Sequence, residues 1–181
     1  EYFNLAADMN NYRAHYYLGI IYMNAYGVQQ NYIEARKHFK LAAEKNDASS
    51  QYNLGNIYLN GFGVQQDVVI AKNYFELAAK QNHPDALFNL GTIHFAGIGV
   101  AQDIPKALNY FELSSQNGNK NASFILATFY SEGEFVEKDP NKSLEYFEKS
   151  GQLNDPNTLL YLGYKSYINQ ETVGIPMILK S

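Results

Sequence analysis

Four histidines, His15, His38, His83 and His94, are the side chains best suited to acid–base chemistry or metal binding near neutral pH. A metal site needs several ligands at a suitable spacing, such as H-x-x-x-H on a helix, and acid–base catalysis needs a partner within reach. The sequence contains no such motif, and we do not expect the four histidines to cluster. His38 and His94 stand at positions where other repeats have tyrosine, so we expect them to replace packing aromatics, and we expect His15 and His83 to face solvent. We therefore predict no catalytic residue, no metal site and no cofactor.

A second set of polar residues is rich in carboxamides. Its central members are Asn53, Asn56, Asn60, Asn89, Thr92 and Thr128. A carboxamide offers both a donor and an acceptor, so a row of them can pair with the main chain of an extended peptide. The alternative interpretation is that these side chains satisfy backbone groups of their own helices. These residues can form a binding surface only if they lie on the same face of the fold.

Two glycine-rich segments could be mistaken for phosphate-binding loops. They are Gly61-Phe62-Gly63-Val64 and Gly97-Ile98-Gly99-Val100. Neither has the G-x-G-x-x-G spacing, and the segment recurs along the chain, which a nucleotide site would not do. Paired glycines of this kind can adopt the positive φ that ends a helix and turns the chain. We interpret them as structural loops.

The elements that carry these residues follow from a repeat of 36 residues. Leucines recur at this step, at Leu18, Leu54, Leu90, Leu126 and Leu162. Glycine follows four of them, at Gly19, Gly55, Gly91 and Gly163, with Ala127 in the remaining unit. Phenylalanines keep the same step, at Phe3, Phe39, Phe75, Phe111 and Phe147. Several columns in one register indicate repeated structural units.

Each unit is predicted to hold two helices, A and B, because apolar residues recur at i, i+4 and i+7 or i+8. Ala14, Leu18 and Tyr22 show this spacing in helix A, and Ala35 and Phe39 show it in helix B. A glycine within helix A costs about 1 kcal/mol relative to alanine. Such a glycine is explained if another helix approaches the bare backbone, so we expect close contact there.

The pattern predicts an all-α fold, in which helix–loop–helix units stack into an α/α superhelical solenoid. The predicted array covers residues 1–168, and residues 169–181 form a C-terminal cap or a transition to other sequence. The units are a partial unit 1–13, full units 14–49, 50–85, 86–121 and 122–157, and a partial unit 158–168. Phe135 replaces the glycine found at Gly99, which suggests a reshaped loop in the last full unit.

These columns resemble the Sel1-like repeat, a relative of the tetratricopeptide repeat with a longer loop between its helices. The resemblance is carried by Leu54-Gly55-Asn56-Ile57-Tyr58, the glycine loop through Asp67, and Ala71, Tyr74, Phe75, Ala78 and Ala79. It implies a non-catalytic adaptor for protein complexes. Some relatives close each repeat with a disulfide, and the absence of cysteine argues against that branch.

If helix A lines the binding face, as in tetratricopeptide stacks, copying its outward positions by 36 residues gives the surface that we name the helix-A strip. Its candidate partner-binding residues are Arg13, Tyr17, Ile20, Asn53, Asn56, Asn60, Asp85, Asn89, Thr92, Thr128, Glu132, Tyr161 and Tyr164.

Composition narrows the classes of partner. Fourteen basic against eighteen acidic residues give a net charge of −4, which argues against nucleic acid. No apolar run is long enough for direct insertion into a membrane. We expect a protein or an extended peptide segment as the partner. Two alternatives stay open: a substrate-recruiting or regulatory arm of a larger enzyme or complex whose catalytic part lies elsewhere, and a structural subunit that stacks on itself through uncapped repeat ends.

Overall fold

The computed structural model describes residues 2–9, 11–151 and the single residues 159, 163 and 167. Over these residues the chain forms helices and no strand. The helices are α1 (Tyr2–Asp8), α2 (Tyr12–Asn24), α3 (Tyr32–Ala43), α4 (Ala48–Asn60), α5 (Val68–Ala79), α6 (Pro84–Ala96), α7 (Ile104–Gln116), α8 (Lys120–Glu132) and α9 (Pro140–Ser150). The predicted all-α repeat architecture is confirmed. The predicted units 158–168 and 169–181 lie largely or wholly outside the described residues.

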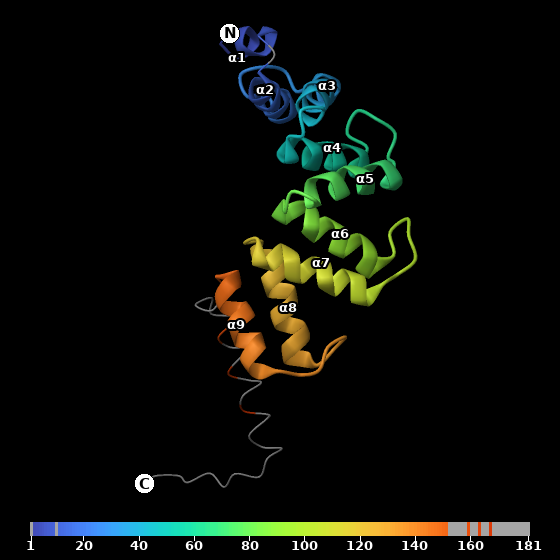
Figure 1. Ribbon diagram of the computed structural model, residues 1–181, viewed down its shortest axis with the longest axis vertical. Helices are drawn as coiled ribbons and strands as arrows, with labels where there is room; N and C mark the ends of the chain where they lie inside the picture. Colours follow the sequence, from blue (N-terminus) through green and yellow to red (C-terminus); the bar gives the residue numbers. More distant parts are fainter. Residues whose placement is uncertain (1, 10, 152–158, 160–162, 164–166, 168–181) are drawn as a thin grey trace.

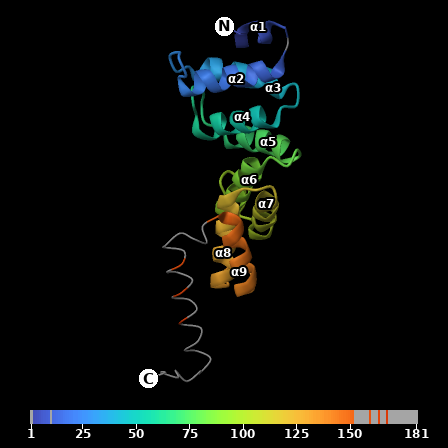
Figure 2. The ribbon, with the colours of Figure 1, turned by 90° about the vertical axis from the view of Figure 1, so that its left-hand side faces the viewer.

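The helices stack as pairs along the long axis of the molecule (Figure 1). Each pair joins a helix A to the following helix B: α2 with α3, α4 with α5, α6 with α7, and α8 with α9. Figure 2 shows that α2 and α3 lie across the view whereas α8 and α9 run nearly along the long axis. The pairs therefore rotate progressively, as in a superhelical solenoid.

Polar caps fix where each helix B begins. The caps are Asn31, Asp67, Asp103 and Asp139, whose side-chain oxygens accept hydrogen bonds from the first-turn N–H groups of α3, α5, α7 and α9. Such caps satisfy backbone donors that have no partner inside the helix. Helix A ends in a left-handed residue, at Ala25, Gly61, Gly97 and Gly133. The 36-residue spacing of caps and ends reproduces the same two-helix unit along the chain.

The apolar core is divided among the junctions between units. One cluster joins Ala71 and Phe75 of α5 to Leu90 and Ile93 of α6, and equivalent clusters join α3 to α4 and α7 to α8. Four members of the phenylalanine column are buried, at Phe39, Phe75, Phe111 and Phe147, whereas Phe3 in α1 is 42% exposed. Because each cluster uses side chains from two neighbouring units, no unit completes its core alone.

The glycines inside helix A are explained by the phenylalanine column. A methyl group on Gly19 would lie 2.6 Å from the ring of Phe39, and one on Gly91 would lie 2.6 Å from the ring of Phe111. Gly55 faces Phe75 in the same way. The expected close approach is confirmed. The approaching group is a phenyl ring of helix B in the same unit.

A side-chain hydrogen bond ties the end of each loop between helix A and helix B back to the end of helix A. Gln30, Gln66 and Gln102 donate to the carbonyl groups of Met23, Leu59 and Phe95, at 2.8, 2.7 and 2.7 Å. The loops after α4, α6 and α8 project from one side of the stack (right side of Figure 1).

The last loop keeps the left-handed backbone of the other loops at Phe135, but its hydrogen bonds differ in part, since the Val136 N–H donates to the Glu134 carbonyl at 2.7 Å. Phe135 has φ +60°, close to the +65° and +66° of Gly63 and Gly99. The loop also ends as the others do, with the Asp139 N–H donating to the Tyr130 carbonyl at 2.9 Å. Phe135 tolerates the left-handed backbone while its ring packs edge-on against Phe95 and Phe129, at 5.3 and 5.1 Å between ring centroids.

Candidate functional site

Four successive A helices carry the described part of the helix-A strip. At the first of them, α2, Arg13 and Tyr17 are exposed, and Tyr17 has 49% of its surface accessible. Ile20 is half-buried because it packs against the core between α3 and α4. Tyr161 and Tyr164 lie outside the described residues. The strip therefore begins with an exposed cation and an exposed phenol on α2.

Two of the central carboxamides meet across a unit boundary. Asn89 Nδ2 of α6 donates a hydrogen bond to Asn56 Oδ1 of α4 at 3.1 Å. Both side chains are half-buried. Their positions 33 residues apart in sequence become adjacent because α4 and α6 belong to stacked units. This bond fixes the orientation of both amide groups.

The other polar members of the strip bond within their own helices. Asn53 Nδ2 donates to the Ser49 carbonyl at 2.8 Å, and Asn60 Nδ2 donates to the Asn56 carbonyl at 2.9 Å. Asn53 is only 9% exposed, so it is not the free surface residue that copying the strip predicts. Asn53 is covered because this face of α4 packs against the neighbouring units. Asn60 is exposed.

The threonines also donate inward, from Thr92 Oγ1 to the Phe88 carbonyl at 3.1 Å and from Thr128 Oγ1 to the Ile125 carbonyl at 2.7 Å. Hydroxyl groups in a helix commonly bond to a preceding carbonyl in this way. Each threonine can therefore contact a ligand through its methyl group or through the lone pairs of its oxygen. Glu132, at the end of α8, is exposed.

Asp85 belongs to a polar junction that the sequence did not reveal. Its Oδ1 accepts from Asn119 Nδ2 at 2.7 Å, and Asn119 Oδ1 accepts from the Ala122 N–H at 2.8 Å as the N-cap of α8. Asn119 thus ties α6 to α8. Its place, equivalent to Asp47 and His83 in the cap column, is a signal that could have identified it.

The histidines do not all lie where the sequence placed them. As expected, His38 and His94 replace packing aromatics: His38 stacks on Tyr22 and His94 stacks on Tyr110, each at 5.7 Å between centroids. The expectation that His15 faces solvent is wrong, because His15 is half-buried. Its Nδ1 lies 3.1 Å from His38 Nδ1, so two of the histidines are in contact.

His83 is also not a solvent-facing residue of a turn. Its Nδ1 accepts from the Ala86 N–H at 3.4 Å as the N-cap of α6, and its ring stacks on Tyr52 at 4.8 Å. Burial lowers the pKa of both His38 and His83, so both rings are held in the neutral form. Among the described residues, no group of three or more histidine, aspartate or glutamate side chains is arranged to hold a metal ion.

The described part of the helix-A strip presents amides, hydroxyls, one phenol and the charged side chains of Arg13, Asp85 and Glu132. Burial raises the pKa of Tyr16, which borders the strip and packs on Phe39, so its hydroxyl is neutral and can donate. Over the described residues, each helix is too short or too polar to cross a membrane.

Helix–loop–helix units that share their cores and rotate along an axis define an α/α solenoid protein. The family can be named from the sequence: the model of the Sel1 repeat matches residues 13–47, 48–83, 84–119 and 121–155. The chain belongs to the Sel1-repeat family. Proteins of this family generally serve as scaffolds for protein interactions, and the fold is typically non-catalytic.

Solved structures resemble the chain over most of its length. A Sel1 repeat protein from Oxalobacter formigenes is 31% identical with a TM-score of 0.78, and covers 90% of this chain and 66% of its own. The protein c5321, a protective antigen of uropathogenic Escherichia coli, is 33% identical with a TM-score of 0.83, over 92% of this chain and 36% of its own. This chain therefore spans less than two thirds of either relative.

A more distant structure is the cysteine-rich protein B of Helicobacter pylori. It is 26% identical with a TM-score of 0.55, over 69% of this chain and 90% of its own. No curated protein matches the sequence.

Proposed function

We propose that this chain is a non-catalytic scaffold that binds an extended segment of a partner protein along the helix-A strip. The observation that carries the proposal is the Asn89–Asn56 hydrogen bond. It uses one amide hydrogen of Asn89 and the carbonyl oxygen of Asn56. Within the described part of the chain, Asn56 Nδ2 and Asn89 Oδ1 have no hydrogen-bond partner. One donor and one acceptor are thus held side by side.

An extended peptide presents the complementary groups. A carbonyl and an N–H alternate along its backbone, so it can accept from Asn56 and donate to Asn89 without any particular side chain. Tyr17, exposed on α2, offers an apolar ring with a polar tip for a side chain of the same segment. The strip contains no lysine, and its one basic residue, Arg13, lies at the α2 end, so the central amides are suited to a neutral backbone.

The test compares capture of a partner by the wild-type chain, by an Asn56→Ala, Asn89→Ala variant and by a control with Asn73→Ala and Asn109→Ala. The control makes the same chemical change at exposed positions of α5 and α7. We expect the first variant to lose the captured protein from lysate of the source cells, and the control to retain it. A peptide from that protein should then bind the wild type in isolation. Equal capture by both variants would exclude the helix-A strip.

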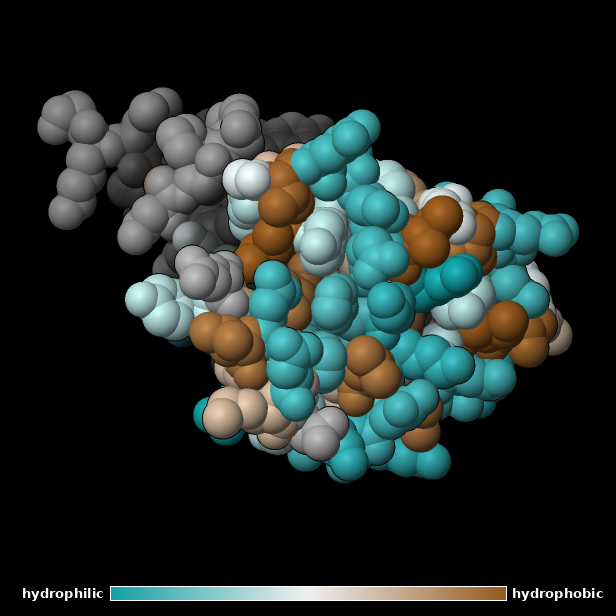
Figure 3. All heavy atoms as spheres, turned by 90° about the horizontal axis from the view of Figure 1, so that it is seen from above, coloured by the Kyte–Doolittle hydropathy of each residue, from teal (hydrophilic) through white to brown (hydrophobic). Residues whose placement is uncertain are grey.

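Self-stacking remains an alternative with an observation behind it. The α1 end exposes Tyr2, Leu5 and Met9, with 86%, 56% and 84% of their surfaces accessible. Figure 3 looks onto this end and shows apolar patches that are separated by polar side chains. Sedimentation over a range of concentrations distinguishes the two ideas, because end-to-end stacking predicts growing assemblies whereas a scaffold needs none.

A further inference from the structure

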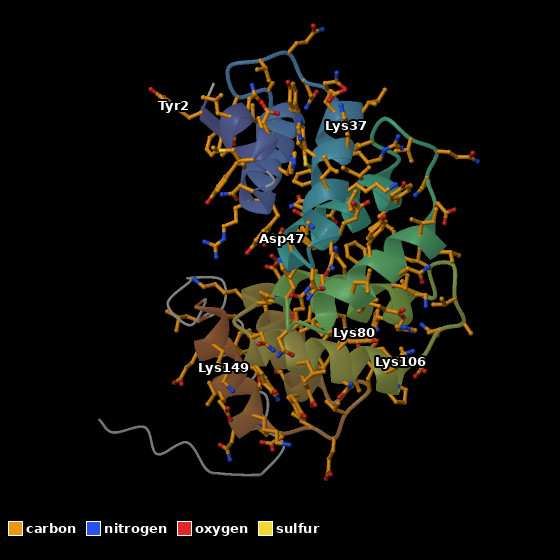
Figure 4. The ribbon with its side chains drawn as sticks, turned by 45° about the horizontal axis from the view of Figure 1, so that its top comes forward. Tyr2, Lys37, Asp47, Lys80, Lys106 and Lys149 are labelled. Atoms are coloured by element: carbon orange, nitrogen blue, oxygen red, sulfur yellow. The ribbon has the colours of Figure 1, made fainter. Side chains whose placement is uncertain are left out.

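A groove on the opposite set of helices differs from the rest of the molecule in charge. It lies between α3 and α5, above α4, and has a volume of about 520 Å³. We name it the α3 groove. Its lining residues are Ile33, Arg36, Lys37, Lys40, Leu41, Glu44, Leu54, Tyr58 and Tyr74. Figure 4 labels Lys37, which marks the position of α3 in the stack.

The basic rim of the groove is a feature of α3 alone. Arg36 and Lys40 are one turn apart, and like charges at this spacing repel. The equivalent residues of α5, Lys72 and Glu76, form an ion pair at 3.0 Å. In α7 and α9 the pair is leucine and glutamate.

The cations of the rim are available to a ligand. Within the described residues Arg36 and Lys40 form no ion pair, while Lys37 lies 3.4 Å from Glu34. A guanidinium and an ammonium kept unpaired beside each other, in a chain of net charge −4, are complementary to an anion. Glu44 is the one carboxylate that lines the groove.

The floor of the groove adds neutral donors and an apolar surface. Tyr58 and Tyr74 stack at 5.8 Å between centroids, above the buried Leu54. Burial is the main cause that raises the pKa of Tyr74, so its hydroxyl keeps its proton and can donate to an anion. Ile33 and Leu41 form an exposed apolar wall, with 59% and 38% of their surfaces accessible.

We propose that the α3 groove binds a short acidic peptide segment in which carboxylates alternate with large apolar side chains. The carboxylates pair with Arg36 and Lys40, and separate apolar side chains of the segment pack on Ile33 and on Leu41. The apolar wall favours such a segment over a free inorganic anion, which would leave the wall in water. The charged rim of this second surface lies on helix B of the first full unit, and its lining residues are all different from those of the helix-A strip.

The test measures fluorescence anisotropy of a labelled peptide that alternates glutamate and leucine, with a glutamine–leucine peptide as the uncharged comparison. An Arg36→Ala, Lys40→Ala variant should bind the acidic peptide at least about tenfold more weakly, because two charge-assisted contacts are lost. The control removes two positive charges elsewhere, with Lys80→Ala and Lys106→Ala at exposed positions (Figure 4), and should bind as the wild type does.

Further outcomes decide the proposal. Binding that survives Arg36→Ala, Lys40→Ala, or that is equal for the glutamine peptide, would overturn it. Competition by inorganic phosphate as strongly as by the peptide would show a simple anion site and would also overturn it. Tyr74→Phe, which keeps the ring and removes the hydroxyl, should weaken binding less than the double variant, and loss of the helix-A strip through Asn56→Ala, Asn89→Ala should leave it unchanged.

Discussion

At the scale of single residues, the contact between helix-A glycines and helix-B phenylalanines sets how closely the two helices approach. We predict that Gly91→Ala destabilises the chain by about 2 kcal/mol, because its methyl group would enter the ring of Phe111. The better helix propensity of alanine offsets about 1 kcal/mol of the clash. Urea unfolding followed by circular dichroism measures the difference.

The matched control for this prediction is a double-mutant cycle with Phe111→Leu. The smaller side chain leaves room for the methyl group, so the double variant should lose less than the sum of the two single losses. Additive losses would show that the ring is not what excludes a side chain at Gly91.

The residue scale also shows how far sequence reasoning reaches. The glycine column predicted a close approach, because glycine lowers the stability of a helix and a close contact explains why it is there. The His15–His38 contact was not predictable, because the two residues have no repeat column in common and meet only once α2 and α3 are packed. Asn53 was placed on the surface by a helical projection, which ignores the neighbouring units that bury it.

At the scale of elements, the loops join units as well as helices. A methyl group on Gly99 would lie 2.9 Å from Val68 Cγ1 at the start of α5, in the preceding unit, whereas nothing lies within 4 Å of one on Gly27. Both glycines have positive φ, +66° and +70°, so alanine strains the backbone at both by about 1 kcal/mol or more.

We therefore predict that Gly99→Ala costs about 1 to 3 kcal/mol more than Gly27→Ala, because it adds a clash to the same backbone strain. Thermal or urea unfolding of the two variants gives the comparison. If the two losses were equal, the loop would not press on the preceding unit.

The loop could be predicted from the sequence because its parts are determined locally. They are a left-handed glycine, a capping aspartate and a fixed spacing. The contacts of the loop could not be predicted, because they are made with the preceding unit. Phe135 shows the limit most clearly. Replacing a glycine predicted a new loop shape, yet Phe135 keeps the left-handed φ of the glycines, and its ring packs on Phe95 and Phe129.

At the scale of the whole molecule, neutral histidines are distributed along the stack. His94 is 6% exposed, and neither ring nitrogen has a hydrogen-bond partner among the described residues. Burial is the main cause that lowers the pKa of His94, followed by the nearby Lys106, and burial and His15 lower that of His38. The folded array therefore prefers these rings without their protons.

This preference makes stability depend on pH. In the unfolded chain a histidine takes up a proton near pH 6.5, whereas in the folded chain it does so only at lower pH. The full stability is thus present above about pH 6.5, and it falls as the pH drops toward the folded pKa values. We predict that the free energy of unfolding is lower at about pH 5 than at about pH 7.

Replacing these histidines by tyrosine, the residue that other units carry, tests whether they cause the pH dependence. Tyrosine occupies the column of His94 at Tyr22, Tyr58 and Tyr130, so His94→Tyr should keep the stacking and remove one titrating group. We expect a smaller difference in unfolding free energy between the two pH values for His94→Tyr, and a smaller one still for His38→Tyr, His94→Tyr. Each unit is stabilised by its neighbours, so losses in the first and third full units weaken the stack as a whole. A pH dependence equal to that of the wild type would show that other groups govern the acid sensitivity.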